Sequence, residues 1–163
     1  MEKAINLIDS FKSLSPKMQE EDIRTFSISD PINNVLQKNQ ELLKKNNIKV
    51  SLNIQDDIKI NSYLHMLIDV IHQLIQNSII HAFEEGKNNQ ISLSVFNTES
   101  HLTLVYQDNG LGIAIESREK IFEPFYTTKR NTNCTGLGMS ILYNRVVHQL
   151  KGEIKYDLSQ AHG

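Results

Sequence analysis

A polar stripe on an apolar-rich segment is the first sign of chemistry in this sequence. A four-residue spacing places Gln73, Asn77 and His81 along one side of a helix predicted over residues 63–83. A neutral oxygen ligand such as the Asn77 amide suits Mg²⁺, which takes its other ligands from phosphates and water. The solvated polar face of an ordinary amphipathic helix gives the same stripe, so it does not define a site by itself.

A second segment, Asp-Asn-Gly-Leu-Gly over residues 108–112, directly follows a predicted strand. Gly110 and Gly112 allow the backbone to turn sharply and to approach a flat ligand closely. A carboxylate fixed at the strand end, here Asp108, can accept a hydrogen bond from an exocyclic amine such as that of adenine. A plain loop turn produces the same short pattern, so this segment also needs support from elsewhere.

A third segment, Thr-Gly-Leu-Gly-Met-Ser over residues 135–140, opens the last predicted helix. Free N–H groups at a helix N-terminus favour an anion, and Gly136 and Gly138 leave room for phosphate oxygens. Lys129 and Arg130 lie a few residues earlier and are candidates to fold over a triphosphate. The alternative for these two basic residues is a solvated loop.

The elements that must position these segments follow from hydrophobic periodicity. Alternation predicts strands over residues 48–54, 58–60 and 154–156 and a hairpin of residues 91–95 with 102–106, whereas a period near 3.6 predicts helices over residues 1–14, 31–45, 63–83 and 138–150. Residues 17–28 show no sustained period, and residues 109–138 are predicted to form a long lid outside the core. This order predicts an α+β sandwich with helices packed on one face of a mixed sheet.

Composition limits the protein class. With 163 residues the chain has the size of about one domain, and its formal net charge of −2 offers no bulk attraction for a nucleic acid or an anionic membrane. The single cysteine, Cys134, excludes an internal disulfide and favours a reducing compartment, so a cytoplasmic location is predicted. No window approaches the roughly 18 apolar residues that a membrane-spanning helix needs.

The three segments together resemble the ATP-binding catalytic domain of sensor histidine kinases. That domain belongs to the GHKL superfamily, which also holds the gyrase B subunit, MutL and the heat-shock chaperone ATPases. The resemblance covers about residues 20–163 and implies a Bergerat-type two-layer α/β sandwich with a long ATP lid. The matching residues are Asn77 in the N-box, Asp108, Gly110 and Gly112 in the first glycine box, Phe122 and Phe125 in the Phe-Glu-Pro-Phe aromatic box, and Gly136 and Gly138 in the second glycine box.

The resemblance also implies residue roles, with ATP and Mg²⁺ as cofactors. Asp108 is expected to bind the adenine amine, Asn77 to hold Mg²⁺, and His81 to lie against the adenine ring. Asn77 and Gln73 are the expected catalytic positions. The further residues expected to bind the nucleotide are Gly110, Gly112, Phe122, Phe125, Lys129, Arg130, Thr135, Gly136, Leu137, Gly138 and Met139.

Gln73 favours a kinase over a hydrolase. Hydrolases of the superfamily place a glutamate four residues before the N-box asparagine as a general base, and an amide cannot take a proton at neutral pH. No His-Glu-x-x-Asn phosphoacceptor segment is present, so the γ-phosphoryl group is expected to go to a histidine on a dimerisation domain absent from this chain, not to a histidine in cis. The six histidines are His65, His72, His81, His101, His148 and His162.

Two alternatives remain open. Ile80 stands where family kinases with a lysine use it on the phosphates, which favours a non-catalytic regulatory GHKL module. A GHKL ATPase requires a base that Gln73 does not supply.

The resemblance further predicts the boundaries and partners. Residues 1–16 are expected to be the end of a preceding dimerisation helix or a linker, residues 20–163 the catalytic domain, and the final strand of the sandwich is expected to be missing, as in an excised fragment. A response regulator is the expected partner of the full-length kinase. The sequence leaves open whether that parent kinase is anchored in a membrane. The fragment itself is expected to contact neither membrane nor nucleic acid.

Overall fold

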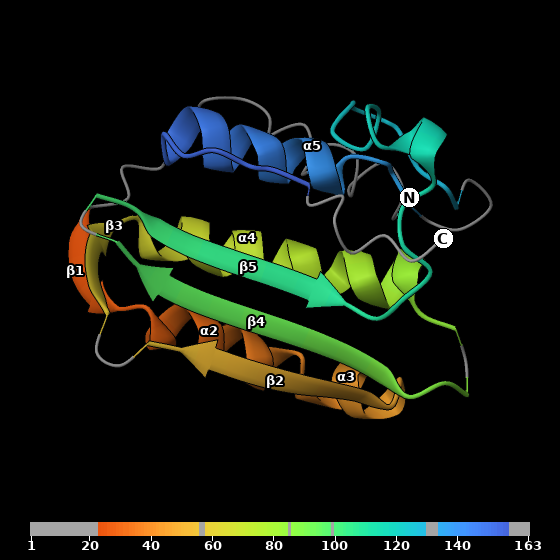
Figure 1. The fold of residues 1–163 in the computed structure, drawn as a ribbon, viewed down its shortest axis with the longest axis horizontal. Coiled ribbons are helices and arrows are strands. Elements are labelled where there is room, and N and C mark those ends of the chain that lie inside the picture. Colours follow the sequence, from red (N-terminus) through yellow and green to blue (C-terminus); the bar gives the residue numbers. More distant parts are fainter. Residues whose placement is uncertain (1–22, 56–57, 85, 99, 130–133, 157–163) are drawn as a thin grey trace, which may run out of the picture. The chain divides into compact units, whose positions relative to one another are not determined.

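The computed structural model describes residues 23–55, 58–84, 86–98, 100–129 and 134–156, which form two compact units (Figure 1). One unit is residues 23–112, and the other contains the described residues from Ile113 onward. The predicted helix over residues 1–14, Arg130 and the end of the chain from residue 157 lie outside the described residues.

The larger unit is built on a mixed sheet of three strands, β2 (Ile48–Ile54), β4 (Asn89–Asn97) and β5 (Leu102–Asp108). Strand β4 is central, parallel to β2 and antiparallel to β5. Thr98 closes the β4–β5 hairpin, because its N–H donates to the carbonyl oxygen of His101 at 2.9 Å. The predicted strand at residues 48–54 and the predicted hairpin are therefore confirmed.

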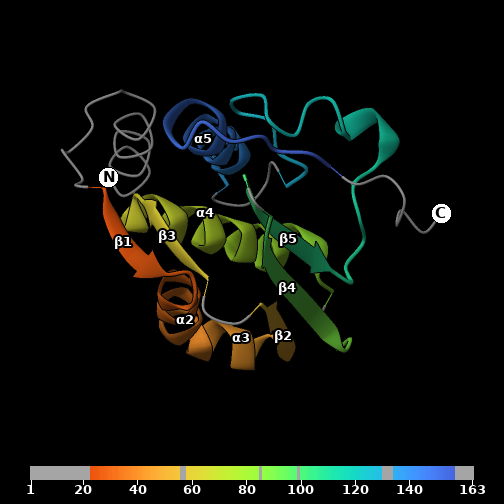
Figure 2. The same ribbon diagram turned by 60° about the vertical axis from the view of Figure 1, so that its left-hand side comes forward.

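Helices α2 (Ser29–Lys38), α3 (Gln40–Lys45) and α4 (Leu64–Asn77) cover one face of this sheet (Figures 1 and 2). Helix α2 packs on α4, and α3 packs on β2. Every second residue of β4 points to this core, and each such apolar side chain stabilises the fold by about 1.5–3 kcal/mol. In this unit the most buried apolar side chains, at most 2% exposed, are Ile28, Pro31, Ile32, Val35, Ile71, Ile75, Ile91, Leu93 and Val95. The predicted α+β architecture is confirmed.

One strand was not predicted from the sequence. Residues Arg24–Ser27 form β1, which pairs antiparallel with β3 (Lys59–Ser62) in a separate two-stranded sheet. Strand β1 has a single buried side chain, Phe26, opposite Ile60. Because one buried residue shows no period, only the pairing with β3 reveals this strand.

The single helix predicted over residues 31–45 is interrupted at Asn39. The buried Asn39 side chain donates from Nδ2 to the carbonyl oxygen of Val35 at 2.8 Å, and its Oδ1 accepts from Nε2 of Gln76 at 2.9 Å. Asparagine favours such side-chain bonds to nearby backbone over a continuous helix. The break therefore ties the end of α2 to α4.

Helix α4 continues into a π-helical turn, η1 (Ser78–Ala82). The Phe83 N–H donates to the carbonyl oxygen of Ser78 at 3.3 Å, five residues back. A π-turn changes which residues share a helix face and is frequent at functional sites. The predicted helix over residues 63–83 is thus correct in extent, but its last turn is wider than the sequence pattern assumes.

The second unit contains a short 3₁₀ helix η2 (Ile115–Ser117), helix α5 (Gly138–Tyr143) and a π-helical continuation η3 (Asn144–Gln149). The helix predicted over residues 138–150 is therefore present, and Lys151, at φ 57°, takes the left-handed conformation directly after it. Residues 109–138 were predicted to lie outside the core. This prediction is wrong at Leu137, which is only 1% exposed.

The strand predicted to start with Ile154 and Tyr156 is not formed over residues 154–156, which have irregular backbone, and the residues after 156 lie outside the described part of the chain. Two alternating apolar residues make a strand only where a neighbouring strand pairs with them, and within residues 134–156 and the other described segments no such ladder reaches them. The Tyr156 ring instead faces the guanidinium carbon of Arg118, 5.6 Å from its centroid.

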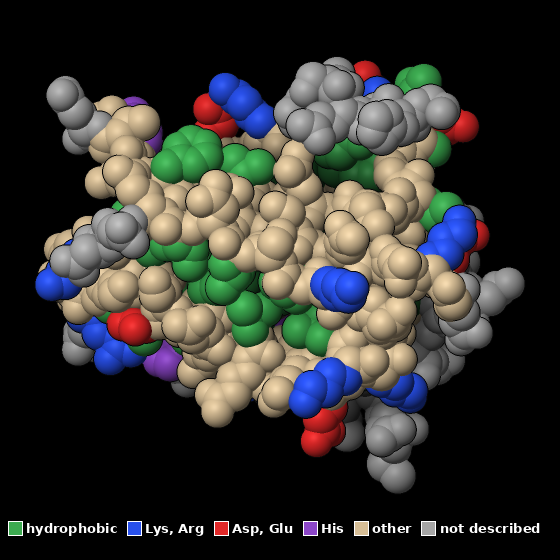
Figure 3. Space-filling view, turned by 60° about the horizontal axis from the view of Figure 1, so that its bottom comes forward, with side chains coloured by type: hydrophobic (Ala, Val, Ile, Leu, Met, Phe, Trp, Pro, Cys, Tyr) green, Lys and Arg blue, Asp and Glu red, His purple; other side chains and the backbone are tan. Residues whose placement is uncertain are grey.

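Surface charge is dispersed on the face shown in Figure 3, where lysine and arginine side chains stand apart and several have an acidic neighbour. None of the helices in the described part of the chain combines the length and apolarity that a membrane crossing requires.

Candidate functional site

Asp108 ends strand β5 on the side of the sheet that faces the helices. Its partner across β4 is Ile91, and the preceding inward positions of β5 pair in the same way, Tyr106 with Leu93. Because residues paired directly across an antiparallel ladder share a face, the carboxylate continues the core row of β5. The register thus carries an acidic side chain, itself exposed, to the edge of the core.

Hydrogen bonds hold both oxygens of the Asp108 carboxylate. Oδ2 accepts from the Ser78 hydroxyl at 2.6 Å, and Oδ1 accepts from the Gly110 backbone N–H at 3.0 Å. An ionised carboxylate offers about four lone-pair sites. Acceptor sites therefore remain for a further donor.

Tyr106 completes a short chain of hydroxyl groups. Its hydroxyl lies 2.8 Å from Ser78 Oγ. Burial raises the pKa of the Tyr106 hydroxyl, and the nearby Asp108 charge adds to this. Tyr106 stays protonated and donates to Ser78, because the single Ser78 proton is directed to Asp108.

Ser78 and Tyr106 were not among the residues predicted for the site. Tyr106 shares the alternation that ends at Asp108, and Ser78 directly follows Asn77. Both positions therefore fit the apolar periodicity of their elements and give no separate sign of a site. The sequence does not show that the end of β5 meets the π-turn.

The loop after β5 fits closely against η1. A Cβ added to Gly110 would lie 2.5 Å from both Cβ and the carbonyl oxygen of Ala82, and the Leu111 N–H donates to that same oxygen at 2.9 Å. Gly112 has φ +72° with no atom within 4 Å of an added Cβ. The two predicted glycines therefore act differently, Gly110 through close approach and Gly112 through a left-handed turn.

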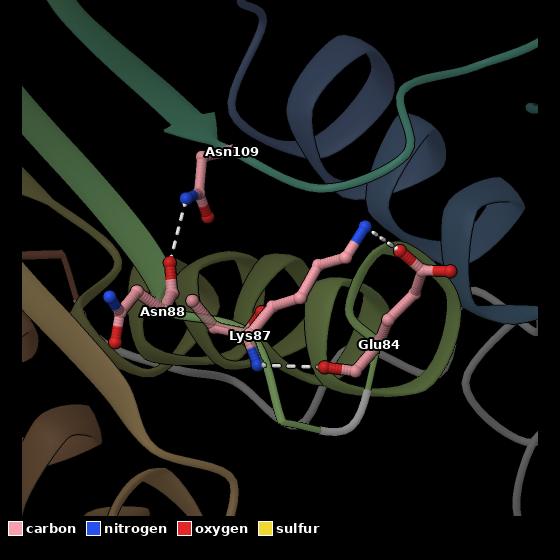
Figure 4. A network of polar contacts seen from close by, with 5 residues as sticks. Glu84, Lys87, Asn88 and Asn109 are labelled. Carbon is pink, nitrogen blue, oxygen red and sulfur yellow. Dashed lines mark hydrogen bonds and ion pairs between the residues drawn. The ribbon is translucent and has the colours of Figure 1, made fainter.

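Asn109 anchors this loop from its other side (Figure 4). Its Nδ2 donates to the Asn88 carbonyl oxygen at 2.9 Å, and its Oδ1 accepts from the Gln90 N–H at 2.7 Å. A shallow pocket of about 290 Å³ lies beside it, with Glu84 and Lys87, which form an ion pair, in its lining. Of the predicted site residues only Gly110 lines this pocket, so the pocket is not the predicted site.

The predicted polar stripe is preserved in part. Gln73 and Asn77 lie one turn apart on α4, Asn77 being its last residue, whereas His81 lies in η1, where the wider π-turn shifts its direction. All three side chains are half-buried, and Ile80 beside them is 36% exposed. In the described segments no three His, Cys, Asp or Glu residues gather as a metal site. A cation at Asn77 would therefore depend on phosphate and water for its remaining ligands.

The second unit holds the remaining predicted residues. Gly136 has φ +69°, and a Cβ added there would lie 2.5 Å from the carbonyl carbon of Phe125, which itself has φ 68°. The Phe122 ring packs on Tyr143 of α5, with centroids 5.2 Å apart. The aromatic box and the second glycine box are therefore in contact with one another.

The start of α5 is stabilised locally. The Leu137 N–H donates to the Thr135 hydroxyl at 3.4 Å, and the Ser140 hydroxyl donates to the Leu137 carbonyl oxygen at 2.9 Å. Gly138 and Met139 form the first turn, Lys129 is exposed, and Arg130 lies outside the described residues. The predicted site residues thus fall into two sets, one in each unit, and the structure gives the arrangement within each set.

Comparison with known proteins identifies the family of this chain. The model of the family described as "Histidine kinase-, DNA gyrase B-, and HSP90-like ATPase" matches residues 65–163, more than half of the chain. The chain belongs to this family, and its fold is the Bergerat-type sandwich.

Several individual relatives are kinases of this kind. Sensor histidine kinase YxdK of Bacillus subtilis is 26% identical over 123 residues, covering 74% of this chain and 37% of YxdK. Sporulation kinase C of the same species is 29% identical over 167 residues, covering 99% of this chain and 37% of that kinase. The catalytic domain of histidine kinase ThkA superposes with a TM-score of 0.68 at 28% identity, covering 77% of this chain and 80% of ThkA's. The chain therefore spans little more than a third of the length of these two curated relatives.

Proposed function

We propose that this chain is the ATP-binding catalytic domain of a sensor histidine kinase, which donates the γ-phosphoryl group of ATP to a histidine on a separate dimerisation domain. The observation that carries this proposal is the Asp108 carboxylate, held through both oxygens at the edge of the core in a chain that belongs to the histidine kinase-like ATPase family. Since ATP is a cytoplasmic substrate, the domain works in the cytoplasm.

Adenine fits the donor and acceptor pattern of this site. An ionised carboxylate accepts hydrogen bonds only, so Asp108 suits the exocyclic amine of adenine. Guanine presents a carbonyl oxygen at the equivalent ring position and would set an acceptor against an acceptor. The site therefore selects ATP over GTP.

The remaining residues suit the phosphates. The Asn77 amide is a ligand of the kind that Mg²⁺ accepts, and Lys129, Arg130 and the turn from Thr135 to Met139 supply cationic and backbone N–H donors. Bound Mg²⁺ neutralises charge on the phosphates. His81, Phe122 and Phe125 offer ring faces to the base or to the lid.

The chemistry left to the protein is positioning. Phosphoryl transfer requires an in-line approach and stabilised charge, with little covalent work by side chains. Gln73 cannot remove a proton from water, which protects the γ-phosphoryl group from hydrolysis. The acceptor histidine belongs to the dimerisation domain of the parent kinase, and a response regulator then takes the phosphoryl group from it.

A transfer assay tests this proposal. The chain is mixed with γ-labelled ATP and the separately purified dimerisation domain of its parent kinase, and label on that domain is measured. Transfer is expected with the wild type, is lost in Asn77→Ala, and is retained in the matched control Asn34→Ala, an exposed residue of α2. ATP binding without transfer to that domain would contradict the kinase assignment.

Ile80 supports a second candidate, a regulatory module that binds ATP without transferring phosphate. Its exposed side chain stands where family kinases with a lysine hold the phosphates. This module would bind Mg-ATP with an affinity that depends on Asp108 and would show no transfer in any length of chain. An ATPase is less favoured, and steady phosphate release abolished by Gln73→Ala would support it.

A further inference from the structure

We infer that Ser78 and Tyr106 are positioning residues for adenine recognition, which fix the Asp108 carboxylate in the orientation that accepts the exocyclic amine. This inference rests on the proposed ATP site and deepens it, since it assigns the orientation of the adenine-binding carboxylate to two residues that were not predicted for the site.

Ser78 is a buried polar residue, 2% exposed, with both of its hydrogen-bonding neighbours in the site. Its hydroxyl lies 2.6 Å from Asp108 Oδ2 and 2.8 Å from the Tyr106 hydroxyl. A separation of 2.6 Å is typical of a hydroxyl that donates to an ionised carboxylate. The serine hydroxyl therefore serves Asp108 and not the packing of the helix.

The carboxylate needs such anchors. The terminal torsion of an aspartate side chain is broad and roughly two-fold, so sterics alone do not fix the plane of the carboxylate. The Gly110 N–H holds Oδ1, and the Ser78 hydroxyl holds Oδ2. With both oxygens held, the directions of the remaining lone pairs are set before a ligand arrives, which reduces the ordering cost of binding.

Tyr106 favours the orientation in which the serine proton points to Asp108. Its hydroxyl lies 2.8 Å from Ser78 Oγ, and a phenol that donates there occupies a lone pair of the serine and leaves the one serine proton for the carboxylate 2.6 Å away. Tyr106 and Asp108 occupy successive inward positions of β5, and Ser78 is the first residue of η1. The chain of donors thus links the strand to the π-turn and ends at the carboxylate.

A merely structural role makes a different prediction. Loss of packing at Ser78 would weaken ATP and GTP binding by the same factor, since both share the phosphates and the sugar. Loss of orientation at Asp108 weakens ATP binding and leaves the weaker GTP binding unchanged. The ratio of the two affinities is therefore the informative quantity.

Calorimetric titration of Mg-ATP and Mg-GTP tests the inference on the wild type, Ser78→Ala, Ser78→Cys and Tyr106→Phe. We expect Ser78→Ala to weaken ATP binding about 10- to 150-fold with GTP unaffected, the size of one lost hydrogen bond to a charged group. Ser78→Cys fills the site with a slightly larger thiol that donates only weakly, so it is expected to behave like Ser78→Ala. The matched control Ser94→Ala, on the outward face of β4, is expected to bind both nucleotides like the wild type.

The double variant tests the direction of action. Tyr106→Phe alone is expected to weaken ATP binding about threefold, and to have no further effect in the Ser78→Ala background because Tyr106 acts through Ser78. Equal effects in the two backgrounds would refute the chain of donors. If Ser78→Ala fails to fold, Tyr106→Phe and Ser78→Cys still test the inference.

The outcomes separate this inference from the function on which it rests. Wild-type ATP affinity in Ser78→Ala, or equal losses for ATP and GTP, would overturn the positioning role while the ATP site stands. Absence of ATP binding to the wild type would overturn the proposed function and the positioning role with it.

Discussion

A methyl group added at Gly110 is expected to force the loop after β5 away from η1. In Gly110→Ala the new Cβ would lie 2.5 Å from Cβ and from the carbonyl oxygen of Ala82, and 2.7 Å from its carbonyl carbon. Two of these three atoms are backbone, so no side-chain rotation relieves the clash. The same carbonyl oxygen accepts the 2.9 Å hydrogen bond from the Leu111 N–H, which separation would break.

The magnitude follows from these two effects. Overpacking a well-filled position costs about 1–3 kcal/mol, and loss of one partly buried backbone hydrogen bond costs about 0.5–1.5 kcal/mol. The free energy of unfolding should therefore fall by about 2–4 kcal/mol. Since the Gly110 N–H also holds Asp108 Oδ1 at 3.0 Å, ATP affinity should fall by about tenfold.

Urea unfolding followed by circular dichroism measures the first quantity, and titration of Mg-ATP measures the second. The matched control is Gly86→Ala, at φ +79° with no atom within 4 Å of the added Cβ. That control carries only backbone strain of about 1–2 kcal/mol, and its ATP affinity should equal that of the wild type. A Gly110→Ala protein as stable as Gly86→Ala, with wild-type ATP affinity, would refute the reasoning.

Three further predictions concern the core, pH and the phosphates. Asn39→Ala, at a 2% exposed position, should lower the free energy of unfolding by about 1–3 kcal/mol in urea unfolding. The control is Asn46→Ala, which removes a similar 2.8 Å hydrogen bond to the Leu42 carbonyl oxygen in an exposed setting. It should lower the free energy of unfolding by much less in the same experiment. The raised pKa of Tyr106 means that the folded state keeps a proton which the unfolded state loses above pH ~10. The free energy of unfolding should therefore fall with pH more steeply in the wild type than in Tyr106→Phe above that pH, by up to about 1.4 kcal/mol per pH unit. Urea unfolding of both proteins at pH 9 and 11 measures this fall, and an equal fall in the two proteins would count against a buried phenol. Ile80→Lys should strengthen Mg-ATP binding about threefold or more through a charge-assisted contact to phosphate, and an unchanged dissociation constant would show that position 80 does not face the phosphates.

Much of the larger unit was predictable because its elements obey simple periods. Alternation along residues 48–54 and across the hairpin gave the sheet strands, and Asp108 fell on the inward side by counting in twos from Leu104. Strand β1 was missed because its single buried side chain, Phe26, carries no period. The strand predicted at residues 154–156 failed for the opposite reason, since alternation was present without a partner in the described residues.

The helix break at Asn39 and the π-turn at Ser78 lay beyond local pattern. Asn39 is compatible with a continuous helix until Gln76, far along the chain, offers its amide. Ser78 reads as one more position on an apolar helix until the end of β5 brings Asp108 within 2.6 Å. In both cases a hydrogen bond between distant segments decides the local geometry.

The sequence by itself determined the family, the order of the motifs and the chemical types at the site, because these depend on residue identity and on spacing along one chain. Tertiary structure decided how Asp108 is held, since that depends on the meeting of a strand end, a π-turn and a glycine loop from different parts of the chain. It also decided that Gly110 is required for close approach and Gly112 for its backbone angle. The residue type determines which donor or acceptor is present, but only the fold sets the distance and direction on which a hydrogen bond depends.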